Sequence, residues 1–196
     1  MQPNRRLFLA ALVALSMVGP ARAQSRSIAG ETFDATAKVA DALLVLNGVG
    51  VRGVAIFNAY AAGLYLTAKA PTPAQLLATP GAKRLQIRMV IDVSAKEFVK
   101  AIDVGIERNT PPEQHPVLAE RQAKFAAQVN ALGTVKKGDA VNLDFVPDRG
   151  LVFTVNGKPQ GDAIPGDDLY AAMLKIFIGD KPVDKRLKDG LLGGGS

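Results

Sequence analysis

Arg52 is the residue of this sequence whose type and surroundings point most directly to chemistry. It is the only basic residue between positions 40 and 67, a stretch that is otherwise almost entirely apolar. A guanidinium in an apolar strand requires water, an internal acid or an anionic ligand, because an unpaired buried charge is costly. Tyr60 and Tyr65 follow Arg52 and carry phenol hydroxyls. Arginine and a tyrosine hydroxyl within an apolar wall suit a carboxylate or phenolate attached to an oily body.

A second interpretation of Arg52 remains open. The residue could lie at a sheet edge, with its aliphatic stem packed and its charged head in water. The glycines at positions 48, 50 and 53 favour the ligand interpretation, because they would leave space around the cation. The same glycines also indicate β-bulges or a close approach by another backbone segment.

The remaining side chains exclude several classes of site. The chain contains no cysteine and a single histidine, His115, which excludes thiolate metal sites, cysteine nucleophiles and multi-histidine metal sites. No phosphate-binding loop, dinucleotide fingerprint or hydrolase motif is present. We therefore expect no cofactor and no metal ion. His115 is expected on the solvated surface, and Asp167 and Asp168 are explained by the start of a helix.

The N-terminus has the pattern of a secretory signal peptide. Arg5 and Arg6 precede an apolar run over residues 7–19, and the leader ends in Ala21-Arg22-Ala23. The run is shorter than the ~20 residues that span a bilayer, so a membrane anchor is the less favoured alternative. We predict cleavage after Ala23 and a periplasmic location. The arginine pair fits both the twin-arginine export route and an ordinary basic leader, and the two routes remain open.

Removal of this leader changes the charge of the chain. The full sequence has a formal net charge of +6, and three of its arginines lie within residues 1–23, so the mature chain carries +3. A partner made of nucleic acid is not expected at this charge. With 48% hydrophobic and 21% charged residues, the composition indicates one folded domain. We place this domain at residues 24–192 and a flexible glycine-rich tail at residues 193–196, and the sequence specifies no oligomeric state.

The elements that position Arg52 and Tyr60 are predicted to be strands. Residues 40–67 form two long buried strands, and alternating apolar residues predict a half-buried strand over residues 84–93. Three short strands follow at residues 140–146, 151–155 and 158–164. The last two are joined by a two-residue turn at Asn156-Gly157.

Four helices are predicted around these strands. A capping-box pattern at residues 94–97 begins the first. The last two are a run buried on nearly all sides, ended by Gly179 in the usual C-terminal position, and a short helix that starts at Asp184. The predicted ranges are 95–107, 113–130, 169–178 and 184–191. The order of elements gives an α+β fold, in which helices cover one side of an antiparallel sheet.

Three segments of the sequence resemble a known family. They are LNGVGVRG at residues 46–53, YAAGLYL at residues 60–66 and FIGDKPV at residues 177–183. Together they resemble the chalcone isomerase superfamily, and most closely its exported bacterial chalcone isomerase-like branch, over residues 30–192. The resemblance implies an open-faced β-sandwich: a large antiparallel sheet that carries a layer of helices.

The same resemblance implies that the catalytic residues of the plant isomerases are mostly absent. Those enzymes close a hydroxychalcone into a flavanone with an arginine, two threonines, a tyrosine and an asparagine. The arginine corresponds to Arg52 and is retained. The other four positions correspond to Tyr60, Phe98, Gly105 and Ile176. Loss of the helix hydroxyl and amide would impair proton handling and enolate stabilisation.

A non-catalytic branch of the family, the fatty-acid-binding proteins, holds a carboxylate with the strand arginine and a nearby tyrosine. By this resemblance, the chain is expected to bind a small amphipathic anion, such as a fatty acid or a flavonoid-like molecule. Arg52 would pair with the head group and Tyr60 would donate to it, while Phe98, Ile102 and Phe177 line the tail. Two alternatives remain, namely an intramolecular lyase of the chalcone isomerase type and an envelope interaction protein without a ligand.

Overall fold

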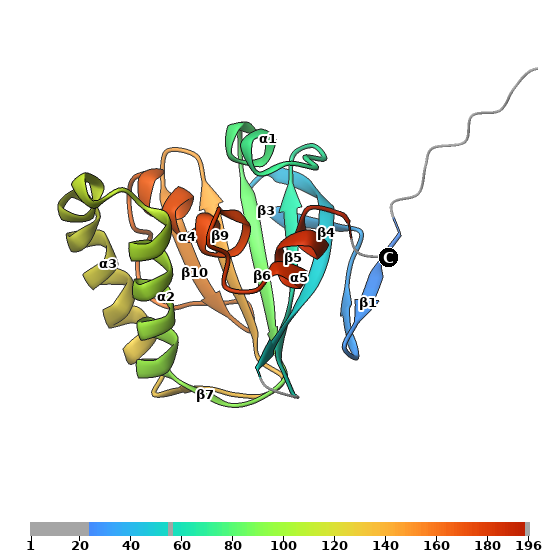
Figure 1. The fold of residues 1–196 in the computed structure, drawn as a ribbon, viewed down its shortest axis with the longest axis horizontal. Coiled ribbons are helices and arrows are strands. Elements are labelled where there is room, and N and C mark those ends of the chain that lie inside the picture. Colours follow the sequence, from blue (N-terminus) through green and yellow to red (C-terminus); the bar gives the residue numbers. More distant parts are fainter. Residues whose placement is uncertain (1–23, 55–56, 195–196) are drawn as a thin grey trace, which may run out of the picture.

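A seven-stranded antiparallel sheet forms the centre of the fold (Figure 1). A computed structural model describes residues 24–54 and 57–194, so the predicted leader lies outside the described residues. The strand order is β11-β10-β9-β6-β5-β4-β3. The strands of this sheet are β3 (Thr36–Val39), β4 (Ala42–Val54), β5 (Phe57–Leu66), β6 (Lys83–Met89), β9 (Ala140–Val146), β10 (Gly150–Val155) and β11 (Lys158–Pro159).

Two short pairs of strands lie outside this sheet. The N-terminal hairpin β1 (Arg26–Ile28) and β2 (Glu31–Phe33) lies beside the β4 side of the sheet (Figure 1). The second pair is β7 (Val93–Ser94) with β8 (Thr134–Val135). The prediction of one strand over residues 84–93 is therefore wrong at its end, because the chain bends after Met89 before Val93 pairs with Val135.

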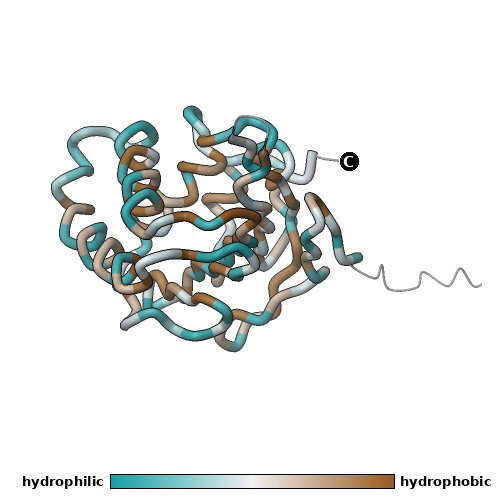
Figure 2. Tube along the Cα trace, turned by 90° about the horizontal axis from the view of Figure 1, so that it is seen from below, coloured by the Kyte–Doolittle hydropathy of each residue, from teal (hydrophilic) through white to brown (hydrophobic). Residues whose placement is uncertain are grey.

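The helices lie mainly on one face of the sheet, as predicted. Their bounds are α1 (Pro73–Ala78), α2 (Ala95–Asn109), a 3-10 turn at Pro112–Gln114, α3 (His115–Asn130), α4 (Asp168–Ile178) and α5 (Lys185–Leu191). The larger core lies between this layer and the sheet, and a smaller core, which includes Phe33 and Tyr65, lies on the other face. Figure 2 shows hydrophobic segments running through the interior. In the described part of the chain, no helix has both the length and the apolar character needed to span a membrane.

Local signals in the sequence account for most of these elements. The Ser94 hydroxyl accepts a hydrogen bond from the Glu97 amide and caps α2, and the Asp184 carboxylate caps α5 by accepting from two amides. Asn156 and Gly157 both have positive φ, at 51° and 77°, as a two-residue hairpin turn requires. These three features were predicted from the residue types alone.

Gly179 ends α4 as predicted, in an extended conformation with φ −72° and ψ −169°, and glycine is favoured there because a Cβ would overlap the Lys175 carbonyl oxygen.

Two predictions about local structure are wrong. The strand expected over residues 158–164 ends at Pro159, which has no amide to donate, and Ile164 makes only an isolated bridge. His115 is half-buried, and its Nε2 lies 3.0 Å from the Thr110 carbonyl oxygen.

The glycines of β4 allow α5 to lie directly on the strand. A Cβ on Gly48 would overlap the Gly190 carbonyl oxygen, and one on Gly50 would lie 2.6 Å from the Leu187 carbonyl oxygen. The expectation that these two glycines leave space around Arg52 is therefore wrong, because helix backbone fills that space. Asn47 fixes the contact, since its Nδ2 donates to the carbonyl oxygens of Leu191 (2.8 Å) and Ala70 (3.0 Å).

This packing predicts a large difference between two substitutions on the same strand. Gly48→Ala should lower the free energy of unfolding by about 2 kcal/mol or more, because the new methyl group meets only backbone atoms of α5. Gly53→Ala is the matched control, since the nearest atom there belongs to the flexible Arg186 side chain, and its effect should stay within about 0.5 kcal/mol. Urea denaturation of both variants provides the measurement. Equal stabilities would contradict the packing argument.

Candidate ligand-binding site

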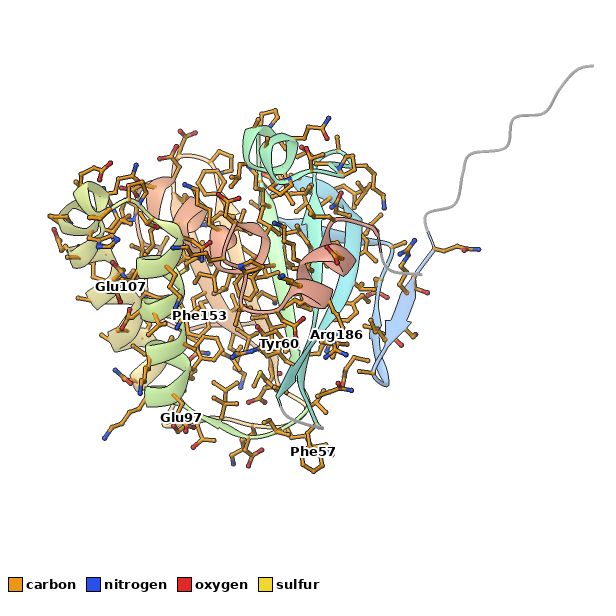
Figure 3. The ribbon with its side chains drawn as sticks, viewed as in Figure 1. Phe57, Tyr60, Glu97, Glu107, Phe153 and Arg186 are labelled. Atoms are coloured by element: carbon orange, nitrogen blue, oxygen red, sulfur yellow. The ribbon has the colours of Figure 1, made fainter. Side chains whose placement is uncertain are left out.

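A cavity of about 310 Å³ lies between the sheet and the helices α2 and α4. The five residues selected from the sequence all line it, from four different elements (Figure 3, which labels Tyr60). Arg52 comes from β4, Tyr60 from β5, Phe98 and Ile102 from α2, and Phe177 from α4. Residues far apart in the sequence thus meet around one space.

Arg52 and Tyr60 form the polar corner of the cavity. They are register partners on β4 and β5, so their side chains leave the sheet on the same face. The Arg52 Cζ lies 5.8 Å from the centre of the Tyr60 ring, within the range of a cation–π contact. Arg52 is half-buried, and Tyr60 is 7% exposed.

No carboxylate of the described residues lies within ion-pair distance of the Arg52 guanidinium. Asp184 contacts the residue next to Arg52. Its carboxylate accepts hydrogen bonds from the backbone amides of Gly53 (3.3 Å), Arg186 (2.8 Å) and Leu187 (3.1 Å). Asp184 thereby caps α5 and fastens the helix to β4. The cation beside the cavity is therefore available to an anion from outside the chain.

Burial keeps Tyr60 in its protonated form. Desolvation raises its pKa from 10.0 to about 12, and Arg52 opposes this rise only in part. A phenol with this pKa stays neutral at physiological pH and can donate its proton in a hydrogen bond. Arg52 and Tyr60 together offer a positive charge and a neutral donor on one side of the cavity.

The rest of the wall is almost entirely apolar. Besides the residues predicted from the sequence, it is formed by Ala59, Ile87, Met89, Ile91, Val93, Ala101, Ile176 and Val183. The sequence does signal two of these, because Ile87 and Met89 belong to the alternating apolar row of β6, but it does not show that the row faces a cavity. Glu97 is the acidic residue of the wall; it is exposed and accepts a hydrogen bond from the Ser94 hydroxyl at the start of α2.

Two positions that the resemblance assigns to catalysis pack against each other. A Cβ on Gly105 of α2 would lie 2.6 Å from Cγ2 of Ile176 on α4. The branched side chain of Ile176 thus occupies the place that an asparagine at position 105 would need. The contact brings α2 and α4 close together, and Ile176 presents an apolar side chain to the cavity.

Metal binding has no support in the described part of the chain. Residues 24–54 and 57–194 contain no cluster of three or more histidine, aspartate or glutamate side chains that could hold an ion. The side chains at the cavity themselves offer a guanidinium, a neutral phenol and an apolar wall.

The tyrosine environment predicts an unusual alkaline titration. Burial raises the pKa of Tyr60 and Tyr65 to about 12 and that of Tyr170 well above 10, so no tyrosine should ionise near pH 10 in the folded protein. The pKa of each tyrosine in the folded protein exceeds the unfolded value of 10.0. The contribution of the protonated tyrosines to the free energy of unfolding is therefore full below pH 10 and is lost progressively as the pH rises towards 12. Tyrosinate absorbance during a pH titration checks this expectation. Ionisation of Tyr60 near pH 10, detected as a step that Tyr60→Phe removes, would contradict it.

Comparisons with known proteins show the fold and the family of the chain. The chain resembles a crystal structure of a fatty-acid binding protein from Arabidopsis thaliana, with a TM-score of 0.67, 15% sequence identity, and coverage of 86% of this chain and 95% of that one. At this identity, the likeness shows a shared fold. No curated protein sequence matches the chain. The family model described as chalcone isomerase-like matches residues 25–193, and the chain therefore belongs to the chalcone isomerase-like family.

Proposed function

We propose that this chain is a non-catalytic, exported member of its family that binds a small amphipathic anion, such as a fatty acid. The observation that carries the proposal is the cavity itself, with one cationic corner inside an otherwise apolar wall. Few ligand classes complement both the cationic corner and the apolar wall. An anionic head group meets Arg52, and a hydrocarbon tail meets the remaining wall.

The residues of the cavity have distinct roles in this proposal. The Arg52 guanidinium pairs with the carboxylate, and the Tyr60 phenol, with a pKa of about 12, donates a hydrogen bond to it. Phe98, Ile102 and Phe177 contact the tail. A volume of about 310 Å³ is at the small end of the roughly 300–1,000 Å³ typical of ligand pockets, which favours a single acyl chain.

The composition of the cavity wall argues against the isomerase alternative. Arg52 could stabilise an enolate, but the protonated Tyr60 does not provide a base, and Gly105 and Ile176 provide no polar group. The acidic residue of the wall, Glu97, lies at the start of α2 and is exposed to solvent. The fold shared with a plant protein described as a fatty-acid binding protein also supports binding over catalysis.

The cavity also argues against an envelope protein without a ligand. That alternative predicts Arg52 paired with an internal acid and no open space beside it. In the described part of the chain, Arg52 has no carboxylate partner and borders about 310 Å³ of cavity. Arg52 therefore has the surroundings of a binding residue and not those of a structural ion pair.

Export of the chain to the periplasm is the second part of the proposal. Its support is the leader pattern at residues 1–23, with Arg5 and Arg6 ahead of an apolar run and small residues before Gln24. N-terminal sequencing of the protein from a periplasmic extract should begin at Gln24. Recovery of a chain that retains the leader, in a membrane fraction, would instead indicate an anchored protein.

Ligand binding is tested with dodecanoate as the probe and isothermal titration calorimetry as the measurement. Arg52→Gln should weaken binding at least tenfold, because a charge-assisted hydrogen bond contributes about 1.5–3 kcal/mol. Tyr60→Phe should weaken it about fivefold through loss of one hydrogen bond. Native mass spectrometry of protein purified without delipidation should show a bound acid in the unsubstituted chain and less of it in Arg52→Gln.

Two controls make the result specific. Arg88→Gln removes a guanidinium from β6 on the face away from the cavity, because Arg88 alternates with Ile87 and Met89, and it should leave binding unchanged. Dodecanol, which has no charge, should bind Arg52→Gln and the unsubstituted chain equally. Dodecanoate affinity unaffected by Arg52→Gln would refute the head-group assignment. Acceleration of 2′-hydroxychalcone cyclisation over its spontaneous rate would refute the non-catalytic assignment.

A further inference from the structure

Ile91 is an exposed residue of the cavity wall, and other exposed apolar and basic side chains that do not line the cavity lie near it. Phe57 is 66% exposed and Ile91 is 40% exposed, and both are among the few large hydrophobic side chains that face solvent. Lys136 and Lys137 are exposed in the loop between β8 and β9. We call these four residues the mouth surface. Figure 3 shows Phe57 pointing away from the body of the molecule, at the same end as the labelled Glu97.

Backbone hydrogen bonds bring the mouth surface together at one end of the sheet. The Val90 amide donates to the Ala59 carbonyl oxygen at 3.0 Å, so Ile91 follows the β6 edge towards the start of β5, where Phe57 lies. Ala59 and Ile91 both line the cavity. Ile91 is therefore both exposed and part of the cavity wall, and Phe57 lies two residues before the wall residue Ala59 on β5.

The same hydrogen-bond network places the two lysines beside Ile91. The Gly138 amide donates to the Met89 carbonyl oxygen at 2.8 Å, and the Lys137 amide donates to the Asp92 carboxylate at 2.8 Å. The Lys136 amide donates to the Asp139 carboxylate at 2.7 Å. The loop is thus held against the segment after β6.

The charges of the mouth surface are available to an external partner. The carboxylates of Asp92 and Asp139 accept hydrogen bonds from backbone amides, and Asp139 also accepts one from the Asn156 side chain. No carboxylate of the described residues lies within ion-pair distance of the Lys136 or Lys137 ammonium group. Two free ammonium groups thus stand next to two exposed apolar side chains.

We propose that the mouth surface docks onto a lipid bilayer that contains anionic lipids, so that the ligand passes between membrane and cavity without crossing water. Phe57 and Ile91 would enter the boundary between head groups and acyl chains, and the lysines would contact lipid phosphates. The transfer of ligand rests on the function proposed above, whereas the docking itself does not. An acyl chain is held in the membrane by the same apolar burial that holds it in the cavity.

Vesicle flotation tests the docking directly. The unsubstituted chain should float with vesicles of phosphatidylcholine and phosphatidylglycerol, and less with phosphatidylcholine alone. Phe57→Ser combined with Ile91→Ser should lower the partition coefficient about tenfold or more, because two exposed apolar side chains are lost. Binding should also weaken as salt concentration rises, since salt screens the lysine charges.

The chain offers matched controls for both substitutions. Leu43 and Val117 are 68% and 62% exposed and lie elsewhere, Leu43 near the opposite end of β4, so the double substitution to serine should leave flotation unchanged. Lys136→Glu with Lys137→Glu should weaken binding to anionic vesicles about tenfold or more, whereas Lys38→Glu, at the Leu43 end of the sheet, should leave it within about fivefold.

The outcomes separate the docking surface from the binding site. Failure of the unsubstituted chain to float, or equal losses in the mouth and control variants, would overturn the proposal and point to a protein partner or to no partner. Calorimetry with dodecanoate in vesicle-free solution measures the cavity independently. Phe57→Ser alone and the double lysine variant change residues that do not line the cavity, so both should retain their affinity for dodecanoate while they lose vesicle binding. A loss of both kinds of binding would also overturn the proposed separation.

Discussion

The contact between α5 and β4 determines where Arg52, the cation of the candidate site, lies. On the helix-facing row of β4, the backbone of α5 covers Gly48 and Gly50, and the next residue of that row is Arg52. Arg52 is therefore the first side chain that β4 can extend towards the helix layer beyond α5. Asp184 begins α5 at this same point and fixes its start to the Gly53 amide. The packing of α5 on the β4 glycines thus leaves Arg52 at the edge of the cavity. Asp184 helps to hold α5 in this position.

The sequence predicted those parts of the structure that depend on local patterns. Alternation and turn chemistry predicted β6 and the hairpin at Asn156, and capping residues predicted the starts of α2 and α5. For Gly48 and Gly50, the sequence indicated a close backbone approach as one interpretation, but it did not show which segment approaches, because the atoms that lie against them come from residues 187–193, far along the chain. Sequence patterns specify local geometry, whereas the need for glycine at these positions depends on contacts between segments that are distant in the sequence.

The cavity wall is apolar at positions where the resemblance places catalytic polar groups. Gly105 packs against Ile176, so α2 and α4 lie close together there. Phe98 adds a ring without a hydroxyl. An apolar wall of this kind suits a hydrocarbon chain and offers little stabilisation to a developing charge away from Arg52. Retention of Arg52 in such a wall is costly unless an anion accompanies it.

A comparison of three cations on the sheet distinguishes the surroundings of Arg52 from those of Arg84 and Lys83. Arg84 forms two hydrogen bonds with Asp144, at 2.7 and 2.6 Å, and its charge is met within the chain. Lys83 lies over the Phe145 ring and donates to the Gly81 carbonyl oxygen; burial lowers its pKa, and Asp167 partly opposes that shift. Arg52 has the Tyr60 ring beside it and a cavity in front of it. Groups of the chain compensate the charges of Arg84 and Lys83, whereas Arg52 has no carboxylate within ion-pair distance among the described residues, so a carboxylate placed in the cavity could form a charge-assisted hydrogen bond with it.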